Sequence, residues 1–335
     1  MKFLNKIHQK INQVTLKSIL SDTISNIRYN KVYTKNCSSI AELRGKYSNK
    51  IGLVVGSGPS LRKEDQSKYI KLHRKKFFLI ACDGALYYLL NKGIVPDLVV
   101  TLDPHPTRIA RWFGDKTLNL KTIQKDNYFR RQDLEIKFQN ELKSNREMIK
   151  LFDKQAYKIK IAICTSSSKL VAQRLLKSKA KLFWWNPLLD DIKKKNSLSK
   201  KIFKMNKLPL INTGGNVGSA SWMIADQVFR FNKIVLLGMD YSYYIDTPIS
   251  STQYYDAIEK VTKDKIEMRK FYKKIVNPHM KKSFYTDHVY LWYRKNFFEM
   301  VDNTDSSTIN CSQAGILFNK RILWTSLKKF CNKNL

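Results

Sequence analysis

Cysteine, glycine, proline and acidic residues are all scarce in this chain of 335 residues. Its five cysteines are an odd number without a Cys-x-x-Cys pair, which argues against both a disulfide framework and a structural zinc site. The 12 glycines and 8 prolines are too few for a long flexible linker or a low-complexity domain. Because 43% of the residues are hydrophobic, we expect most of the chain to pack into α/β structure.

Long hydrophobic runs are also missing. No stretch is long enough to span a bilayer, and lysine and glutamine interrupt residues 2–20, which therefore lack the apolar region of a signal peptide. A cytoplasmic location is expected. The same residues place apolar side chains at helical spacing among lysines, which predicts a basic amphipathic helix. Such a helix would either pack on the main domain or make a peripheral contact with the inner membrane.

Charge is strongly unbalanced, with 62 lysines and arginines against 27 acidic residues and a net charge of +35. Such a field attracts polyanions, including nucleotide substrates and anionic membranes. Only 14 of the 62 basic residues are arginine, however, and the chain contains no arginine-rich segment, zinc finger or aromatic RNA-binding motif. Nucleic acid is therefore a disfavoured partner, and lysines on solvated faces are the simpler explanation of the charge.

Short apolar runs alternate with helical segments along most of the chain, which predicts strands at 51–56, 77–83, 98–103, 159–165, 180–186 and 233–243. This alternation indicates an α/β fold, a Rossmann-like doubly wound and mainly parallel sheet with flanking helical extensions. We expect an exposed loop at 192–207 and helices in 244–335. The predicted organisation is a helical N-terminal extension at 1–48, one domain at 49–325 with a helical insertion at 105–157, and a C-terminal tail at 326–335.

Two glycine turns each separate a predicted strand from a predicted helix. The first, GSGPSL, predicts a phosphate or nucleotide cradle because tight turns and helix N-termini offer N–H groups to anions. It is neither the dinucleotide fingerprint, since Leu61 stands at the third glycine position, nor a P-loop. A sharp structural turn would look the same. The second turn, NTGGN, adds short polar side chains, and the candidate nucleotide-binding residues in the two turns are Gly56, Ser57, Gly58, Pro59, Ser60, Asn212, Thr213, Gly214, Gly215 and Asn216.

Three aspartates lie at predicted strand ends, and the carboxyl ends of parallel strands share one edge of a sheet. Asp83 and Asp103 would face the same crevice as the first turn, where they would hold Mg²⁺, contact a ribose or act as a base. Asp240 would line the nucleotide from the last of these strands. The structural alternative for Asp83 is a cap on the helix that begins at Gly84.

Two of the five histidines are candidate general bases. His105 lies two residues after Asp103, and His288 lies beside Asp287. Both are equally consistent with ordinary surface histidines. No histidine pair has the spacing of a metal site.

Several segments, in order over residues 50–325, together resemble one family. They are VVGSGPSL, DGALYYLLNKGIVPDLVVTLDP, TGGNVGSASWMIADQ, IVLLGMDYSY, TDHVYLWYRKNFFEM and TINCSQAGILF. This family groups the MptE-like 6-hydroxymethylpterin diphosphokinases with the motility accessory factor (Maf) proteins, which are glycosyltransferase-like.

The resemblance implies a Rossmann-like core and a nucleotide-dependent transferase. One branch moves pyrophosphate from ATP to a pterin alcohol with Mg²⁺. The other implies transfer of a sialic-acid-like nonulosonic sugar from a CMP-sugar. On this analogy residues 56–60 would contact the nucleotide phosphates beside Asp83 and Asp103, while Asn216 and Asp240 would line the donor or acceptor side.

Two departures from the family pattern favour the second branch. Pro104 follows Asp103, where diphosphokinases tend to have a DxD pair, and Gln313 and Ala314 replace an acidic segment near the C-terminus. We therefore expect a glycosyltransferase that uses a CMP-sugar and a glycan or protein hydroxyl acceptor, with catalytic candidates Asp103, His105 and His288 and with Arg108 or Arg111 on the phosphate.

Two alternatives stay open. One is a Mg-ATP-dependent diphosphokinase with a pterin acceptor and a metal site at Asp83 and Asp103. The other is a non-catalytic basic binding module.

Overall fold

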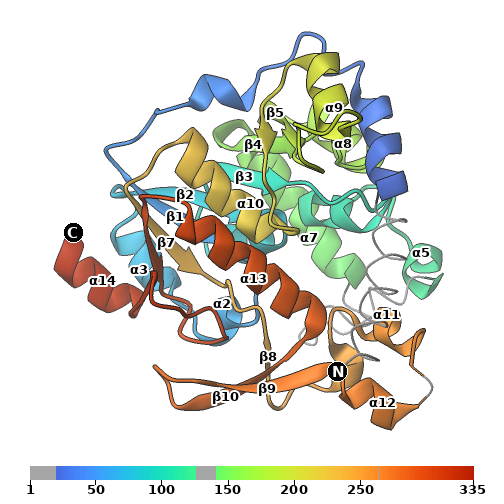
Figure 1. Ribbon diagram of the computed structural model, residues 1–335. Helices are drawn as coiled ribbons and strands as arrows, with labels where there is room; N and C mark the ends of the chain where they lie inside the picture. The colour runs from blue at the N-terminus through green and yellow to red at the C-terminus, as the bar shows by residue number, and fades with distance from the viewer. Residues whose placement is uncertain (1–19, 126–140, 263) are drawn as a thin grey trace.

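A nine-stranded parallel sheet forms the centre of the molecule (Figure 1). The structure, a computed structural model, describes residues 20–125, 141–262 and 264–335. The strand order is β12-β11-β7-β1-β2-β3-β4-β5-β6, and every neighbouring pair is parallel. The strands are β1 (Ile51–Val55), β2 (Phe77–Cys82), β3 (Leu98–Thr101), β4 (Lys160–Cys164), β5 (Lys181–Pro187), β6 (Leu210–Ile211), β7 (Lys233–Leu237), β11 (Ser307–Asn310) and β12 (Ile322–Trp324).

β1 and β2 are apolar along their whole length because helices cover both faces of the sheet. On one face lie α3 (Ser67–Leu72), α4 (Leu86–Asn91), α7 (Glu141–Gln155), α8 (Lys169–Leu176) and α14 (Leu327–Asn334). On the other lie α10 (Val217–Met223) and α13 (His288–Asp302). Successive residues of β1 alternate between the two cores, with Leu53 in one and Val54 in the other. The doubly wound, Rossmann-like α/β fold predicted from the sequence is therefore confirmed.

The chain reverses its direction across the sheet between β1 and β7. From β1 it proceeds outward to β6, then returns to add β7, β11 and β12 on the other side of β1. In register, Gly52 lies beside Phe78 of β2 and beside Ile234 of β7. In open α/β sheets such a reversal leaves a crevice at the carboxyl ends of the two strands.

A second, antiparallel sheet has the order β8-β10-β9 and lies at the bottom of Figure 1. Its strands are β8 (Tyr243–Tyr244), β9 (Tyr272–Asn277) and β10 (Lys282–Asp287), with α11 (Tyr255–Glu259) and α12 (Lys265–Arg269) between the first two in sequence. The expectation that 244–335 would be helical was wrong for β9 to β12. β9 and β10 contain lysines and exposed positions, and β11 and β12 are only four and three residues long, so none of them has the apolar run that identified the central strands.

The expected loop at 192–207 was also wrong, because α9 (Leu198–Asn206) occupies most of it. The Ser197 side chain caps this helix by accepting a hydrogen bond from the Lys200 N–H, and Ile202 is buried beneath it. The remaining short helices are η1 (Ile40–Leu43), α2 (Ser60–Lys63), η2 (Asp83–Ala85), η3 (Arg108–Phe113), α5 (Leu120–Lys125), η5 (Ala156–Lys158), η6 (Ile224–Val228) and η7 (Ile249–Ser251).

Residues 20–30 form a helix that packs over the loops after β3 and β4. Asn26 donates hydrogen bonds to the carbonyls of Pro104 and Ser166, at 2.8 and 2.9 Å. The basic amphipathic helix predicted for 2–20 lies outside the described residues, apart from its last residue.

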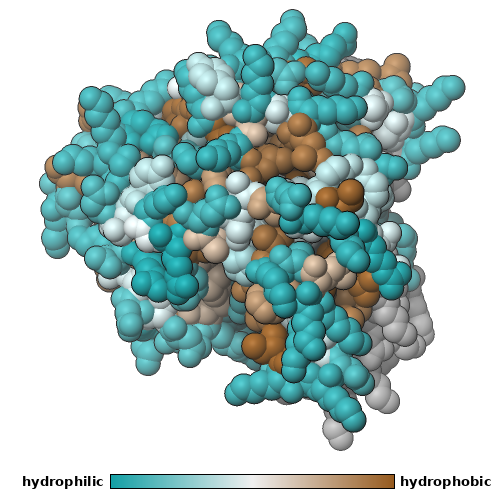
Figure 2. Space-filling view, turned by 90° about the horizontal axis from the view of Figure 1, so that it is seen from above, coloured by the Kyte–Doolittle hydropathy of each residue, from teal (hydrophilic) through white to brown (hydrophobic). Residues whose placement is uncertain are grey.

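Hydrophilic side chains cover most of the face shown in Figure 2, with hydrophobic residues exposed in patches. Within the described ranges, no helix combines the length and the hydropathy that crossing a bilayer requires.

One buried side-chain hydrogen bond links α10 to the sheet. The indole N–H of Trp222, which is fully buried, donates to the Thr308 hydroxyl of β11 at 3.0 Å. Thr308→Val keeps the shape but leaves this donor unpaired, so the free energy of unfolding should fall by about 1–3 kcal/mol. Urea unfolding measures the change. In a Trp222→Phe background the same substitution should be nearly neutral, and an equal loss there would contradict the assignment.

Candidate functional site

The glycine turn after β1 is held against the end of β7. The N–H of Gly56 donates to the Leu237 carbonyl at 2.7 Å, and the N–H of Gly58 donates to the Gly238 carbonyl at 2.8 Å. A Cβ on Gly56 would lie 2.5 Å from the Gly238 oxygen, so only glycine permits this approach. These two N–H groups therefore bond to the end of β7 and not to a ligand. A ligand would contact the outer surface of the turn instead.

The Asp240 side chain holds the same turn in place by hydrogen bonds. Its carboxylate accepts hydrogen bonds from the Ser60 N–H at 2.7 Å and from the Ser60 hydroxyl at 2.5 Å. The side chain is buried, and burial raises the pKa of Asp240 to about 6. The structure thus brings Asp240 and Ser60 to the predicted site, but as groups that shape the turn.

A cleft of about 400 Å³ opens over the outer surface of the turn, at the reversal between β1 and β7. Its volume suits a ligand of nucleotide size. One wall comes from the turn, from α2 and from η3, and the other comes from the segment after β7 and from α13. The lining residues are Ser57, Gly58, Pro59, Arg62, Lys63, Gly84, Trp112, Tyr243, Tyr244, Asp246, Thr247, Ser251, Gln253 and Tyr290.

The cleft is lined by two cationic side chains and by several aromatic rings. Lys63 lies 3.3 Å from the Asp246 carboxylate, and its Nζ lies 4.1 Å from the centre of the Tyr244 ring. Arg62 is the second cation on the same short helix. Cations beside aromatic faces suit a ligand that combines an anionic group with a base or sugar ring.

The cleft lining includes functional residues that sequence reasoning missed. Arg62 and Lys63 directly follow GSGPSL, so their position next to this motif could have identified them. Nothing in the sequence connected Trp112 or Tyr290 with the turn. Arg111, expected at the phosphate, is instead buried in an ion pair with Glu141, with both carboxylate oxygens at 3.0 Å. The side chain of Arg108 lies outside the described residues.

Asp83 lies directly behind the cleft at the end of β2. Its carboxylate accepts the Gly84 N–H at 2.7 Å and the Thr101 hydroxyl at 2.8 Å. A Cβ on Gly84 would lie 3.0 Å from the Ser57 side chain, so Gly84 separates Asp83 from the turn. Burial, with a smaller contribution from the charge of Asp103, raises the pKa of Asp83 to about 7.

The residues at this edge do not fit a Mg²⁺ site. Magnesium requires several oxygen ligands at once, but both oxygens of Asp83 already accept hydrogen bonds. In the described ranges, no three acidic, histidine or cysteine side chains lie close enough to hold a metal ion together. A metal pair of Asp83 and Asp103 is not supported by this donor set.

The polar side chains of the second glycine turn bond to N–H groups of the turn itself and of α10. Asn216 caps α10 by accepting the Ser219 N–H at 2.9 Å, and Asn212 accepts the Gly214 N–H at 3.0 Å. A Cβ on Gly215 would lie 2.6 Å from the Tyr293 ring, so the turn packs beneath α13. The cleft lining given above does not contain residues 212–216, including Thr213.

The candidate bases differ in their surroundings. Asp103 accepts the N–H of His105 at 2.8 Å, and both side chains are half-buried on the loop after β3. His288 is buried in the first turn of α13, where its ring packs edge-on against Phe271 with centres 5.2 Å apart. Asp103 lies close enough to Asp83 for its charge to help raise the pKa of Asp83, and the cleft lining given above contains none of the three candidate bases.

Asp287, which sequence reasoning treated only as a neighbour of His288, fixes two cleft rings. It caps α13 by accepting the N–H groups of Val289 and Tyr290 at 2.8 and 2.9 Å, and it accepts the Tyr243 hydroxyl at 2.7 Å. Tyr243 and Tyr290 stack with centres 5.2 Å apart. One buried carboxylate therefore positions the aromatic wall.

Asp83→Asn should stabilise the protein in a pH-dependent way. Folding raises the pKa of Asp83 from 3.8 to about 7, so the folded state binds the proton more tightly and loses stability as pH rises through this range. The asparagine oxygen can still accept the Gly84 N–H, and its amide NH2 can donate to the Thr101 hydroxyl in place of the carboxylate that accepted from it, all without the charge. Its advantage in unfolding free energy should grow from pH 4 to pH 7 and then stay constant, reaching roughly 1–4 kcal/mol.

Chemical unfolding at several pH values measures this difference. A pH-independent effect of Asp83→Asn would contradict the ionisation argument.

Comparisons with known proteins agree with this architecture. A solved structure titled as a MAf glycosyltransferase from Magnetospirillum magneticum AMB-1 aligns with a TM-score of 0.55 and 15% identity, covering 91% of this chain and 38% of that one. At this identity the likeness concerns the fold. An uncharacterized protein of Treponema pallidum (strain Nichols) is 27% identical over 85 residues, which are 25% of this chain and 37% of that protein. The chain thus spans less than half the length of either relative.

A family model described as "6-hydroxymethylpterin diphosphokinase MptE-like" matches residues 22–246, which include the glycine turn, Asp83, Asp103 and Asp240. The match covers well over half of the chain. It shows that the chain belongs to the 6-hydroxymethylpterin diphosphokinase MptE-like family.

Proposed function

We propose that the protein is a glycosyltransferase that moves a sialic-acid-like nonulosonic sugar from a CMP-sugar to a hydroxyl of a glycan or protein. The cleft carries this proposal, because it combines Arg62 and Lys63 with aromatic walls and because the described part of the chain offers no group of three side chains suited to Mg²⁺. A CMP-sugar has a single phosphate, whose charge two cations can balance. A pyrophosphate transfer from ATP depends more heavily on metal ions.

The reaction requires one bond to form and one to break at the anomeric carbon. The acceptor oxygen attacks this carbon, the bond to the phosphate oxygen breaks, and CMP leaves with the bonding electrons. Arg62 and Lys63 would stabilise the charge that develops on the leaving phosphate. The acceptor proton would pass to the Asp103 and His105 loop, which follows β3 at the same edge as Asp83.

The aromatic side of the cleft would hold the base or the sugars. Trp112 borders the turn, and Tyr243 and Tyr290 face it from the opposite wall. Flat faces of this kind bind bases and sugar rings with little loss of side-chain entropy.

Arg62→Ala should weaken CMP binding by roughly 10- to 100-fold, the loss expected for a charge-assisted hydrogen bond to phosphate. Arg62→Lys should recover part of it. Lys68→Ala, an exposed lysine on the neighbouring α3, is the control and should bind CMP like the wild type.

Thermal-shift titrations with CMP, a CMP-sugar and ATP, each with and without Mg²⁺, measure these affinities. A response to ATP with Mg²⁺ alone would favour the diphosphokinase alternative. Failure of every nucleotide to bind would leave the non-catalytic basic module.

Asp103→Asn and His105→Ala should lower kcat by roughly 100- to 10,000-fold while leaving CMP affinity unchanged, because a base acts on the acceptor and not on the nucleotide. Donor hydrolysis or sugar transfer to a mixed glycan acceptor provides the assay. Activity lost in His288→Gln but retained in both other variants would instead assign the base to His288.

A further inference from the structure

The edge of the parallel sheet opposite the cleft carries a row of basic residues. We call this surface the amino edge, since the strands begin there. Of the eight strands from β12 to β5 in the sheet order, six begin at a lysine or directly after a basic residue. These basic residues are Lys50, Lys76, Lys160, Lys181, Lys233 and Arg321.

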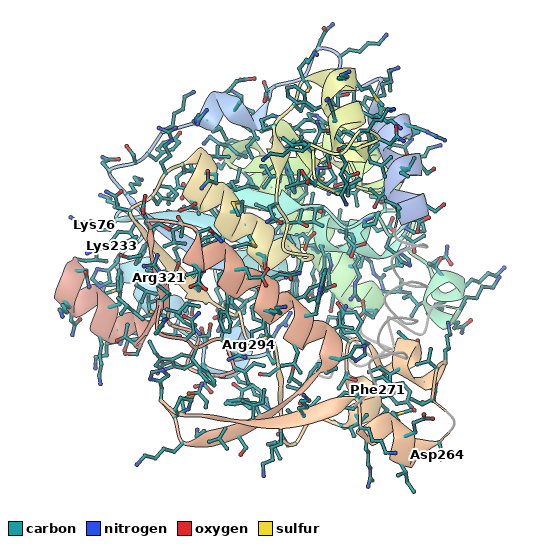
Figure 3. All side chains as sticks on the ribbon, viewed as in Figure 1. Lys76, Lys233, Asp264, Phe271, Arg294 and Arg321 are labelled. Carbon is teal, nitrogen blue, oxygen red and sulfur yellow. The ribbon has the colours of Figure 1, made fainter. Side chains whose placement is uncertain are left out.

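Strand register places these residues in line. Lys160 pairs with Lys181, and Lys233 pairs with Ser307, whose next neighbour across the sheet is the start of β12. Figure 3 shows Lys76, Lys233 and Arg321 on the same side of the molecule. Because neighbouring strands are about 4.8 Å apart, the row extends over roughly 34 Å.

Acidic residues hardly interrupt the row. Asp97, which precedes β3, is ion-paired with Arg74 at 3.0 Å, and Asp305 precedes β11. The turns that lead into the strands add further exposed cations, namely Arg44, Lys46, Lys75, Lys158, Lys179, Arg230 and Lys320. The amino edge is therefore strongly positive.

Exposed apolar groups accompany the cations at the amino edge. Tyr47, Leu72 and Tyr157 lie in the segments that lead into β1, β2 and β4, with exposed fractions of 37%, 70% and 63%. Lys160 lies 5.6 Å from the centre of the Tyr47 ring, and Lys158 lies 5.2 Å from that of Tyr157. Tyrosine rings with a polar end suit the headgroup region of a membrane.

The residue types favour lipid over nucleic acid. Five of the six residues in the row are lysines, which act as point charges, whereas base recognition depends on the planar fork of arginine. Lysines next to exposed aromatic and aliphatic side chains are typical of contacts with anionic headgroups.

We propose that the amino edge docks the protein on an anionic lipid surface, with the cleft turned away from that surface. Docking uses residues remote from the cleft, so it does not depend on the proposed function.

Co-sedimentation of the full chain with vesicles of phosphatidylglycerol and phosphatidylcholine, compared with phosphatidylcholine alone, tests this docking. A triple variant, Lys76→Glu, Lys181→Glu and Lys233→Glu, should reduce binding at least 100-fold, since each lysine near the surface contributes roughly fivefold. The matched control reverses three exposed lysines on the antiparallel sheet, Lys273, Lys274 and Lys282, and so changes the net charge equally.

The control should bind the anionic vesicles within about threefold of the wild type, as its lysines lie off the amino edge. Equal losses in both variants would overturn the proposal, because only net charge would matter. Tighter binding of double-stranded DNA at the same salt, lost in the first variant alone, would reassign the edge to nucleic acid and also overturn it. CMP affinity is measured in both variants as well. If it equals that of the wild type, a change in vesicle binding concerns the amino edge alone and does not bear on the proposed function.

Discussion

The close approach of β1 and β7 at Gly56 and Gly238 is the contact on which the rest of the site depends. Without side chains at these positions, the two strand ends come near enough for Asp240 to reach Ser60, 180 residues earlier in the chain. Burying the Asp240 carboxylate is costly, as its raised pKa indicates, and the two hydrogen bonds from Ser60 offset that cost. The turn is thereby shaped so that Ser57, Gly58 and Pro59 present their outer surface to the cleft.

A second buried carboxylate supports the opposite wall. Asp287 caps α13 and accepts the Tyr243 hydroxyl, so a single group positions aromatic rings that come from β8 and from the first turn of a helix. The cleft therefore lies between the parallel sheet and the antiparallel sheet, and each wall is held by its own buried carboxylate. A ligand bound there would contact both walls. The charge and shape of the cleft therefore depend on how the second sheet packs.

The two glycine turns show that the sequence predicted where the chain turns sharply better than which residues line the cleft. GSGPSL and NTGGN were both predicted to contact a nucleotide, and only the outer residues of the first turn line the cleft. Glycine and short polar side chains are needed wherever a backbone turns sharply, so the pattern alone does not separate N–H groups that meet a ligand from those that bond to the protein itself, as the N–H groups of Gly56, Gly58 and Gly214 do. The strands β9 to β12 were missed for a related reason, since strands that are largely exposed or only three or four residues long carry no apolar run that distinguishes them from helices.

The sequence by itself determined the parallel sheet and the edge at which to look for a site. Strands buried on both faces must be apolar throughout, as in IGLVV and FFLIAC, and the carboxyl ends of parallel strands necessarily meet at one edge. Only the tertiary structure decided which side chains line the cleft. Trp112, Tyr243 and Tyr290 join the glycine turn because β7 returns beside β1 and the second sheet folds back over the turn. Contacts between residues so distant in the chain impose no periodicity or spacing on the sequence, and so they leave no local signal in it.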